Sequence, residues 1–116
     1  MNSKIAGLLG MSRRAGRLSI GFDAVVGELA GGKAALVLLA ADASPKTCKE
    51  IRFAVAKHAA VAPLCVLQAD KQMLAQWLGA QKPVGVCCVN DAGFAAALQK
   101  AGVQPNAVNK EEETRL

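Results

Sequence analysis

Residues 34–41 (AALVLLAA) are the stretch that most restricts the fold of this chain. The run is apolar throughout and offers no polar position to solvent, with Lys33 before it and Asp42 after it. A strand with one wet face alternates apolar and polar residues, whereas a strand covered on both faces is apolar without a break. The run therefore predicts the central strand of a sheet that has helices on both sides.

Helical and extended patterns alternate around this strand. Apolar spacing and turn residues predict helices over residues 4–14, about 21–30, 45 to about 58, 71–78 and about 92–100, and further strands over 17–20, 63–67 and 84–89. Ser44, Asp70 and either Asn90 or Asp91 are expected as helix N-caps. This alternation predicts an α/β fold, a three-layer α-β-α sandwich with a small mixed central sheet.

The 116 residues suffice for one domain with a single core. We expect that domain over residues 1–104. Residues 105–116 are polar, with three consecutive glutamates, and are expected to form a disordered tail.

Positive charge is concentrated in the first half of the chain. Residues 1–57 carry nine lysines and arginines against four acidic residues, whereas residues 58–104 carry three against two. This distribution favours a polyanion such as nucleic acid as partner, although the same charge also promotes solubility.

The cysteines indicate a reduced, intracellular protein. The four residues Cys48, Cys65, Cys87 and Cys88 show no C-x-x-C spacing, and each has the apolar surroundings typical of a small buried residue. We expect no metal site and no cofactor. No run approaches the roughly 20 apolar residues of a membrane span, so we expect a cytoplasmic protein that does not bind membranes.

Motifs for catalysis are absent from the sequence. No serine or cysteine has a recognisable His–acid partner set, and no glycine-rich nucleotide-binding motif occurs. His58 is expected on the buried face or at the end of its helix. Asp42 follows the buried strand, where α/β proteins place sites, but is expected to form the turn there. We therefore expect a protein that is not an enzyme.

Residues 13–21, the arginine-rich stretch, are the candidate for phosphate binding. They contain three arginines followed by a glycine at a helix entrance: Arg13, Arg14, Arg17 and Gly21. Guanidinium groups beside free backbone N–H groups favour an anion. We expect residues 14–21, the turn at 44–45 and the loop 79–84 to meet at one end of the sheet. Such a surface could hold a bent phosphate backbone.

Five segments of the chain resemble the ribosomal-protein superfamily that binds kink-turn RNA, the L-seven-Ae and L-thirty-e group. They are residues 21–29, 32–45, 70–74, 82–84 and 91–95. The similarity covers about residues 4–100 and is particularly close to the bacterial YlxQ-type members. It implies a helix–sheet–helix sandwich that clamps the bend of a kink-turn, usually within a larger ribonucleoprotein.

The phosphate-binding argument and the resemblance together give the residues expected to contact RNA. They are Arg14, Arg17, Gly21, Asp23, Ser44, Lys46, Cys48, Lys71, Lys82, Pro83 and Val84. By resemblance, Lys71 matches a phosphate-contacting lysine, and Lys82 stands where an arginine of the last loop reaches RNA. Ser44 and Cys48 occupy positions that line a pocket for a flipped nucleotide in the family.

The chain departs from the family at the helix that begins at Gly21. There the family has Gly-x-Asn-Glu-x-x-Lys, whose polar side chains recognise tandem sheared G·A pairs. Asp23, Ala24 and Gly27 stand at the positions of the asparagine, glutamate and lysine. We therefore expect RNA binding mainly through phosphate and shape contacts, with a steep dependence on salt.

The alternative is a protein-interaction module on the same fold that does not bind RNA. It is favoured by the missing base-recognising side chains and by Phe53, which the helical spacing places among lysines rather than with the core residues. We expect a monomer, with ribosomal or other RNA-complex proteins as further partners.

Overall fold

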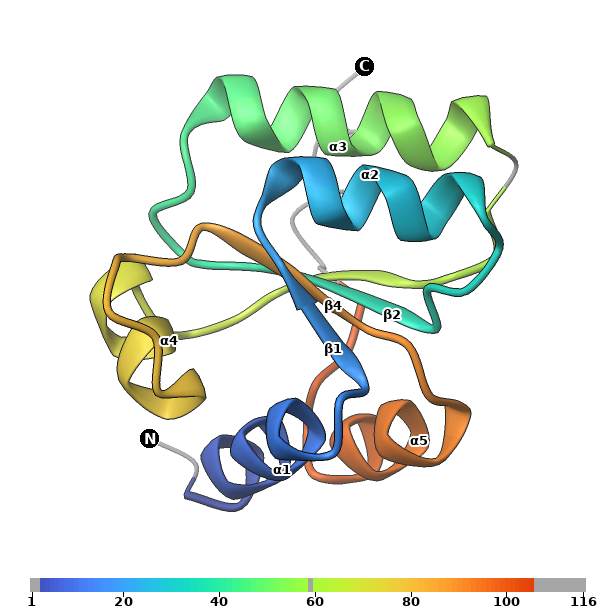
Figure 1. Cartoon of the computed structure of the whole chain (residues 1–116). Helices are drawn as coiled ribbons and strands as arrows, with labels where there is room; N and C mark the ends of the chain where they lie inside the picture. Colours follow the sequence, from blue (N-terminus) through green and yellow to red (C-terminus); the bar gives the residue numbers. More distant parts are fainter. Residues whose placement is uncertain (1–2, 59, 106–116) are drawn as a thin grey trace.

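The computed structural model describes residues 3–58 and 60–105 (Figure 1). These residues form helices and strands in the order α1 (Ser3–Arg14), β1 (Leu18–Ile20), α2 (Phe22–Ala30), β2 (Leu36–Leu39), α3 (Pro45–Lys57), β3 (Leu64–Val66), α4 (Lys71–Leu78), β4 (Val86–Val89) and α5 (Ala92–Lys100). The predicted order is confirmed, but each strand is shorter than its apolar run. The flanks of β2 still pair, because the Ala35 and Ala40 N–H groups donate to Val89 and Gly85.

The described strands form one mixed sheet in the order β1-β4-β2-β3. β2 pairs parallel with β3 and antiparallel with β4, which in turn pairs antiparallel with β1. β1, β2 and β3 therefore end at the same edge of the sheet at which β4 begins. This edge is called the site edge below.

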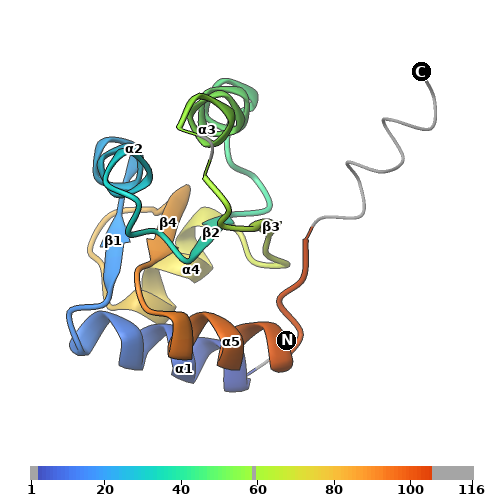
Figure 2. The same ribbon diagram turned by 90° about the vertical axis from the view of Figure 1, so that its right-hand side faces the viewer.

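Helices cover both faces of the sheet, which confirms the predicted three-layer sandwich. In Figure 2, α2 and α3 lie on one side of the strands, and α1 and α5 on the other. Leu36 and Leu38 of β2 pack in the core with residues of α1, α4 and α5, whereas Val37 and Leu39 pack with residues of α2 and α3. The run at 34–41 needs no polar residue because both faces of β2 are buried.

The predicted helix caps are present. The Ser44 hydroxyl accepts a hydrogen bond from the Thr47 N–H at 3.1 Å, and the Asp70 carboxylate accepts one from the Met73 N–H at 2.8 Å. Of the two candidates for α5, Asp91 is the cap. His58 ends α3 as its C-cap and is half-buried.

Three of the cysteines are buried, as predicted, and the fourth is not. The buried cysteines are Cys65, Cys87 and Cys88. Cys48 is only half-buried. It lies on α3 three residues before Ile51, the first fully buried residue of that helix.

Two further findings concern the described residues. None of their helices is both long enough and apolar enough to cross a membrane. Of the predicted disordered tail, only Pro105 is described, and residues 106–116 lie outside the described part of the chain.

Candidate nucleic-acid interface

Backbone hydrogen bonds join the segments that meet at the site edge. The Gly21 N–H donates to the Val86 carbonyl at 3.0 Å, and the Ala41 N–H donates to the Ala69 carbonyl at 2.8 Å. The Val84 N–H donates to the Lys71 carbonyl at 3.0 Å. The entrance of α2, the turn after β2, the start of α4 and the loop before β4 therefore form one connected surface. The predicted meeting of Gly21 with the turn after β2 and the loop 79–84 is confirmed.

Asp42 holds two of these segments together. Its Oδ1 atom accepts a hydrogen bond from the Lys71 N–H at 2.8 Å, which joins the turn after β2 to the first residue of α4. The aliphatic part of Lys71 lies close to Gly85, since a Cβ at Gly85 would be 3.7 Å from the Lys71 Cδ. Asp42 is thus a turn-forming residue, as predicted, and it positions Lys71.

Gly21 has a backbone conformation that fits glycine. Its φ of 98° and ψ of 159° lie in a region that residues with a Cβ rarely adopt. No side chain caps α2, so the first N–H groups of this helix have no acceptor within it. They add partial positive charge at the site edge, and the exposed Asp23 in the first turn offsets part of it.

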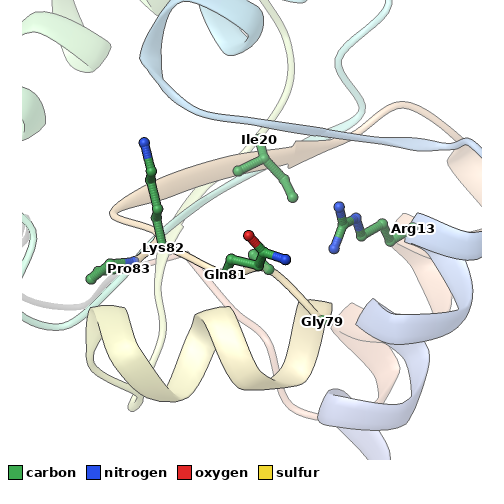
Figure 3. A pocket seen from close by; sticks show the side chains of 7 residues that line it. Arg13, Ile20, Gly79, Gln81, Lys82 and Pro83 are labelled. Carbon is green, nitrogen blue, oxygen red and sulfur yellow. The ribbon is translucent and has the colours of Figure 1, made fainter.

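A pocket of about 500 Å³ lies beside this edge (Figure 3). It is lined by Arg13, Ile20, Gly79, Ala80, Gln81, Lys82 and Pro83. In Figure 3, Arg13 and Lys82 flank the pocket on opposite sides, with Ile20 and Gln81 between them. Two cations, one amide and an apolar wall are suited to a phosphate with an adjoining base or ribose.

Arg13 is held in place by the end of α4. Its Nη1 atom donates to the Leu78 carbonyl at 2.6 Å, and a cation at a helix C-terminus also interacts favourably with the helix dipole. Close packing of α1 against α4 allows this contact, since a Cβ at the buried Gly10 of α1 would lie 3.3 Å from the carbonyl oxygen of Trp77 in α4. The bond uses only part of the guanidinium, which has further N–H donors.

Arg13 belongs to the arginine-rich stretch but is not among the residues expected to contact RNA. The spacing of Arg13 from the buried residues of α1 could have identified it as a site residue. Arg13 follows the buried Leu9 by four residues and the buried Gly10 by three, so it lies on the face of α1 that packs against α4.

The structure divides the arginine-rich stretch. Arg17 precedes β1, and its carbonyl accepts a hydrogen bond from the Asn90 N–H at 2.8 Å, at the end of the sheet opposite Gly21. Arg14 lies along α1, since its Nη1 would be 3.3 Å from a Cβ at Gly10. The expectation that the whole stretch meets at the site edge is therefore wrong for Arg17, because β1 separates it from Gly21.

The other residues expected to contact RNA fall into three groups. Lys82 and Pro83 line the pocket, and Val84 is buried in the core. Lys71 is half-buried at the start of α4. Ser44, Lys46 and Cys48 lie in the first turn of α3 or at its cap, where the Cys48 thiol donates to the Ala43 carbonyl at 3.8 Å.

The buried cysteines are poor nucleophiles and poor metal ligands. Burial raises the pKa of Cys65 to about 11 and that of Cys88 to about 11, with a further contribution to Cys88 from Glu28. Burial and the neighbouring Cys88 raise the pKa of Cys87 to about 12. All three remain thiols at neutral pH. Within residues 3–58 and 60–105, no group of three or more His, Cys, Asp or Glu side chains could hold a metal ion.

A chain of hydrogen bonds joins Cys88 to α2 instead. The thiol donates to Asn90 Oδ1 at 3.2 Å, and Asn90 Nδ2 donates to the Ser19 hydroxyl at 3.0 Å. Ser19 in turn donates to Glu28 at 2.9 Å. These bonds attach α2 to β1 and β4 and so help to fix the orientation of α2 at the site edge.

Solved structures share this architecture. A protein of unknown function from Bacillus halodurans is 33% identical in sequence, with a TM-score of 0.74 over 84% of this chain and 95% of that one. The Giardia lamblia 15.5kD RNA binding protein is 20% identical, with a TM-score of 0.69 over 85% of both chains, and shares the fold.

Comparison by sequence gives a more definite assignment. No curated protein matches the chain in sequence. The model of the ribosomal protein L7Ae/L30e/S12e/Gadd45 family, however, matches residues 3–99, and the chain therefore belongs to that family.

Proposed function

We propose that this protein is a non-catalytic RNA-binding protein that recognises a bent, kink-turn-like RNA mainly through phosphate and shape contacts. The observation that carries the proposal is the pocket between Arg13 and Lys82 at the site edge. Family membership supports it, and so does the shared fold of a Giardia lamblia protein that is described as RNA-binding. The closer relation to YlxQ-type proteins is part of the same proposal.

The lining of the pocket has the chemistry of RNA contacts. Arg13 donates one bond to Leu78, and its other guanidinium N–H groups can donate to a phosphate oxygen. Lys82 supplies a second, exposed cation. Gln81 can both donate and accept, which suits a ribose 2′-hydroxyl or a base edge.

The side chains at the start of α2 account for the emphasis on phosphate. Asp23, Ala24 and Gly27 are all exposed, and none carries an amide or a cation. Ala24 and Gly27 have no side-chain group that can hydrogen-bond a base, and the Asp23 carboxylate repels phosphate. Sequence discrimination by α2 is therefore weak, and affinity falls steeply as salt displaces the contacts to phosphate.

The direct test is fluorescence anisotropy with a kink-turn RNA and a fully paired duplex of equal length, at low and moderate salt. We expect the kink-turn RNA to bind more tightly. Lys82→Ala lowers its affinity by about fivefold to tenfold and reduces the salt dependence by about one phosphate contact. Lys100→Ala is the matched control, because Lys100 is also exposed but lies at the end of α5. Absence of binding at low salt, or equal effects of the two variants, would refute the proposal.

A gain-of-function variant tests the role assigned to α2. Introducing Asp23→Asn, Ala24→Glu and Gly27→Lys together restores the family pattern on an exposed surface. We expect higher affinity for a kink-turn RNA with tandem G·A pairs, and no gain for one in which Watson–Crick pairs replace them. If both RNAs respond alike, the start of α2 does not face the G·A pairs.

A further inference from the structure

The outer face of α3 carries an exposed aromatic side chain. Phe53 is 68% exposed, although Ile51 and Ala54 of the same helix are buried against the sheet. Lys49 lies four residues before Phe53 and Lys57 four residues after it, and both are exposed. Residues four apart are neighbours on a helix surface, so a lysine lies one turn away on either side of the ring. These three residues are called the α3 stripe.

The fold does not require an aromatic residue at this position. α3 has a serine N-cap and a proline in its first turn, and its packing comes from its opposite face. Phenylalanine is a weaker helix former than the lysine or glutamate that would serve on an exposed face. Single exposed apolar residues are common, but the regular spacing of the flanking cations distinguishes this one.

The α3 stripe and the pocket belong to different layers of the molecule. The pocket is lined by Arg13 of α1 and by the loop after α4, and Ile20 packs with the core cluster on that side. α3 lies on the opposite side of the sheet, together with α2 (Figure 2). An RNA bound in the pocket therefore leaves the α3 stripe accessible to a second partner.

We propose that the α3 stripe docks an acidic amphipathic segment of a partner protein. An apolar side chain of that segment packs on Phe53, and its carboxylates lie over Lys49 and Lys57. From Lys49 to Lys57 the α3 stripe spans about 12 Å, the length of a little over two helical turns. One short helix can therefore cover it, in the manner of a helix bound through spaced anchor residues.

Charge and shape favour a protein over a second RNA segment. Glu50 is exposed three residues before Phe53 and would repel a phosphate backbone, whereas a protein segment can place a cation or a neutral group there. RNA bound by stacking needs successive aromatic side chains. Phe53 is the only aromatic among the large exposed apolar residues of the described chain.

Site-specific photo-crosslinking identifies the occupant. The full-length protein carries p-benzoylphenylalanine at position 53 in the cell from which it comes, with the same group at the exposed Gln72 of α4 as the control position. After irradiation and nuclease treatment, mass spectrometry maps the attached molecule. We expect a nuclease-resistant adduct with an acidic segment of another protein, formed at position 53 and absent at position 72.

A charge-swap measurement on the identified segment, made as a synthetic peptide, completes the test. Lys49→Glu with Lys57→Glu weakens peptide binding by about tenfold, and replacing two acidic residues of the peptide with lysine restores binding to that variant. Adducts with RNA or with a second copy of the chain, adducts equal to those at position 72, or binding that ignores the charge reversal would overturn the proposal.

The α3 proposal and the RNA proposal fail separately. The double variant leaves the pocket intact but lowers the net charge of the protein from +5 to +1. At moderate salt, where long-range charge effects are screened, its preference for the kink-turn RNA over the paired duplex is therefore expected to match that of the unchanged protein. If the protein binds the peptide but no RNA, the RNA proposal is refuted and the role of the α3 stripe stands.

Discussion

Replacing Gly21 with alanine isolates the contribution of one backbone conformation at the site edge. Apart from its two chain neighbours, no residue has an atom within 4 Å of a Cβ at Gly21, so the substitution creates no steric clash with other segments of the protein. The expected loss of stability comes from strain in the backbone of residue 21, which has φ 98° and ψ 159°. Relaxation to a negative φ is opposed by two hydrogen bonds of 3.0 Å, from Gly21 to Val86 and from Val25 to Gly21.

The size of the effect follows from these contacts. A residue with a Cβ in this region of φ and ψ is strained by about 1–3 kcal/mol. Alanine also restricts the unfolded chain, which returns about 0.4–1 kcal/mol. We therefore expect Gly21→Ala to lower the free energy of unfolding by about 1–2 kcal/mol.

Gly27, inside the helix that Gly21 precedes as N-cap, provides the matched control. A Cβ there would also meet nothing within 4 Å, but Gly27 lies inside α2 and has no positive φ. Alanine is the better helix former by about 0.8–1 kcal/mol, so Gly27→Ala is expected to stabilise the protein. The same chemical change thus alters stability in opposite directions at the N-cap of α2 and inside this helix.

Urea unfolding followed by circular dichroism measures both variants, with the midpoint shift converted through a shared slope. We expect Gly21→Ala below the unchanged protein and Gly27→Ala above it. A Gly21→Ala protein as stable as the original, or two variants destabilised alike, would refute the reasoning from backbone conformation.

Three further predictions concern the site edge and the buried cysteines. Asp42→Ala removes the acceptor for the Lys71 N–H and is expected to lower the free energy of unfolding by about 1 kcal/mol. Asp42→Asn keeps an acceptor and is expected to lower it by less. Equal urea midpoints for the two variants would contradict this role of Asp42. Ellman's reagent modifies Cys48 first in the folded protein and all four thiols in urea, and rapid native reaction of all four would contradict the described burial. Because burial raises the thiol pKa from 9.0 to about 11, thiols of the unfolded chain ionise first as the pH rises. The stabilisation by each buried thiol is therefore complete below about pH 9, and above that pH the free energy of unfolding falls by about 1.4 kcal/mol per pH unit for each buried thiol. Urea titrations at about pH 8 and pH 10 are expected to show a smaller fall for Cys65→Ala than for the unchanged protein.

Features that depend on neighbouring residues could be predicted from the sequence. Ser44 and Asp70 cap their helices through bonds to N–H groups only three residues away, so the pattern of a few residues is sufficient to identify them. The unbroken apolar run at 34–41 likewise identified β2 as a strand buried on both faces. The order of the elements and the three-layer sandwich follow from such local patterns.

Features that depend on strand pairing could not be predicted from the sequence. Apolar patterns do not show that β4 lies between β1 and β2, antiparallel to both, since pairing joins residues far apart in the chain. The residues at the site edge depend on that arrangement. It places Arg17 beside Asn90, away from Gly21.

The sequence by itself thus determined the elements, their order, the buried central strand and the basic, motif-poor character of the chain. Only the tertiary structure decided that Arg13 rather than Arg17 joins Lys82 at the pocket, and that the pocket and Phe53 lie in different layers. The physical reason is range: caps and periodicity act over three or four residues, whereas Arg13 is held by Leu78, 65 positions along the chain.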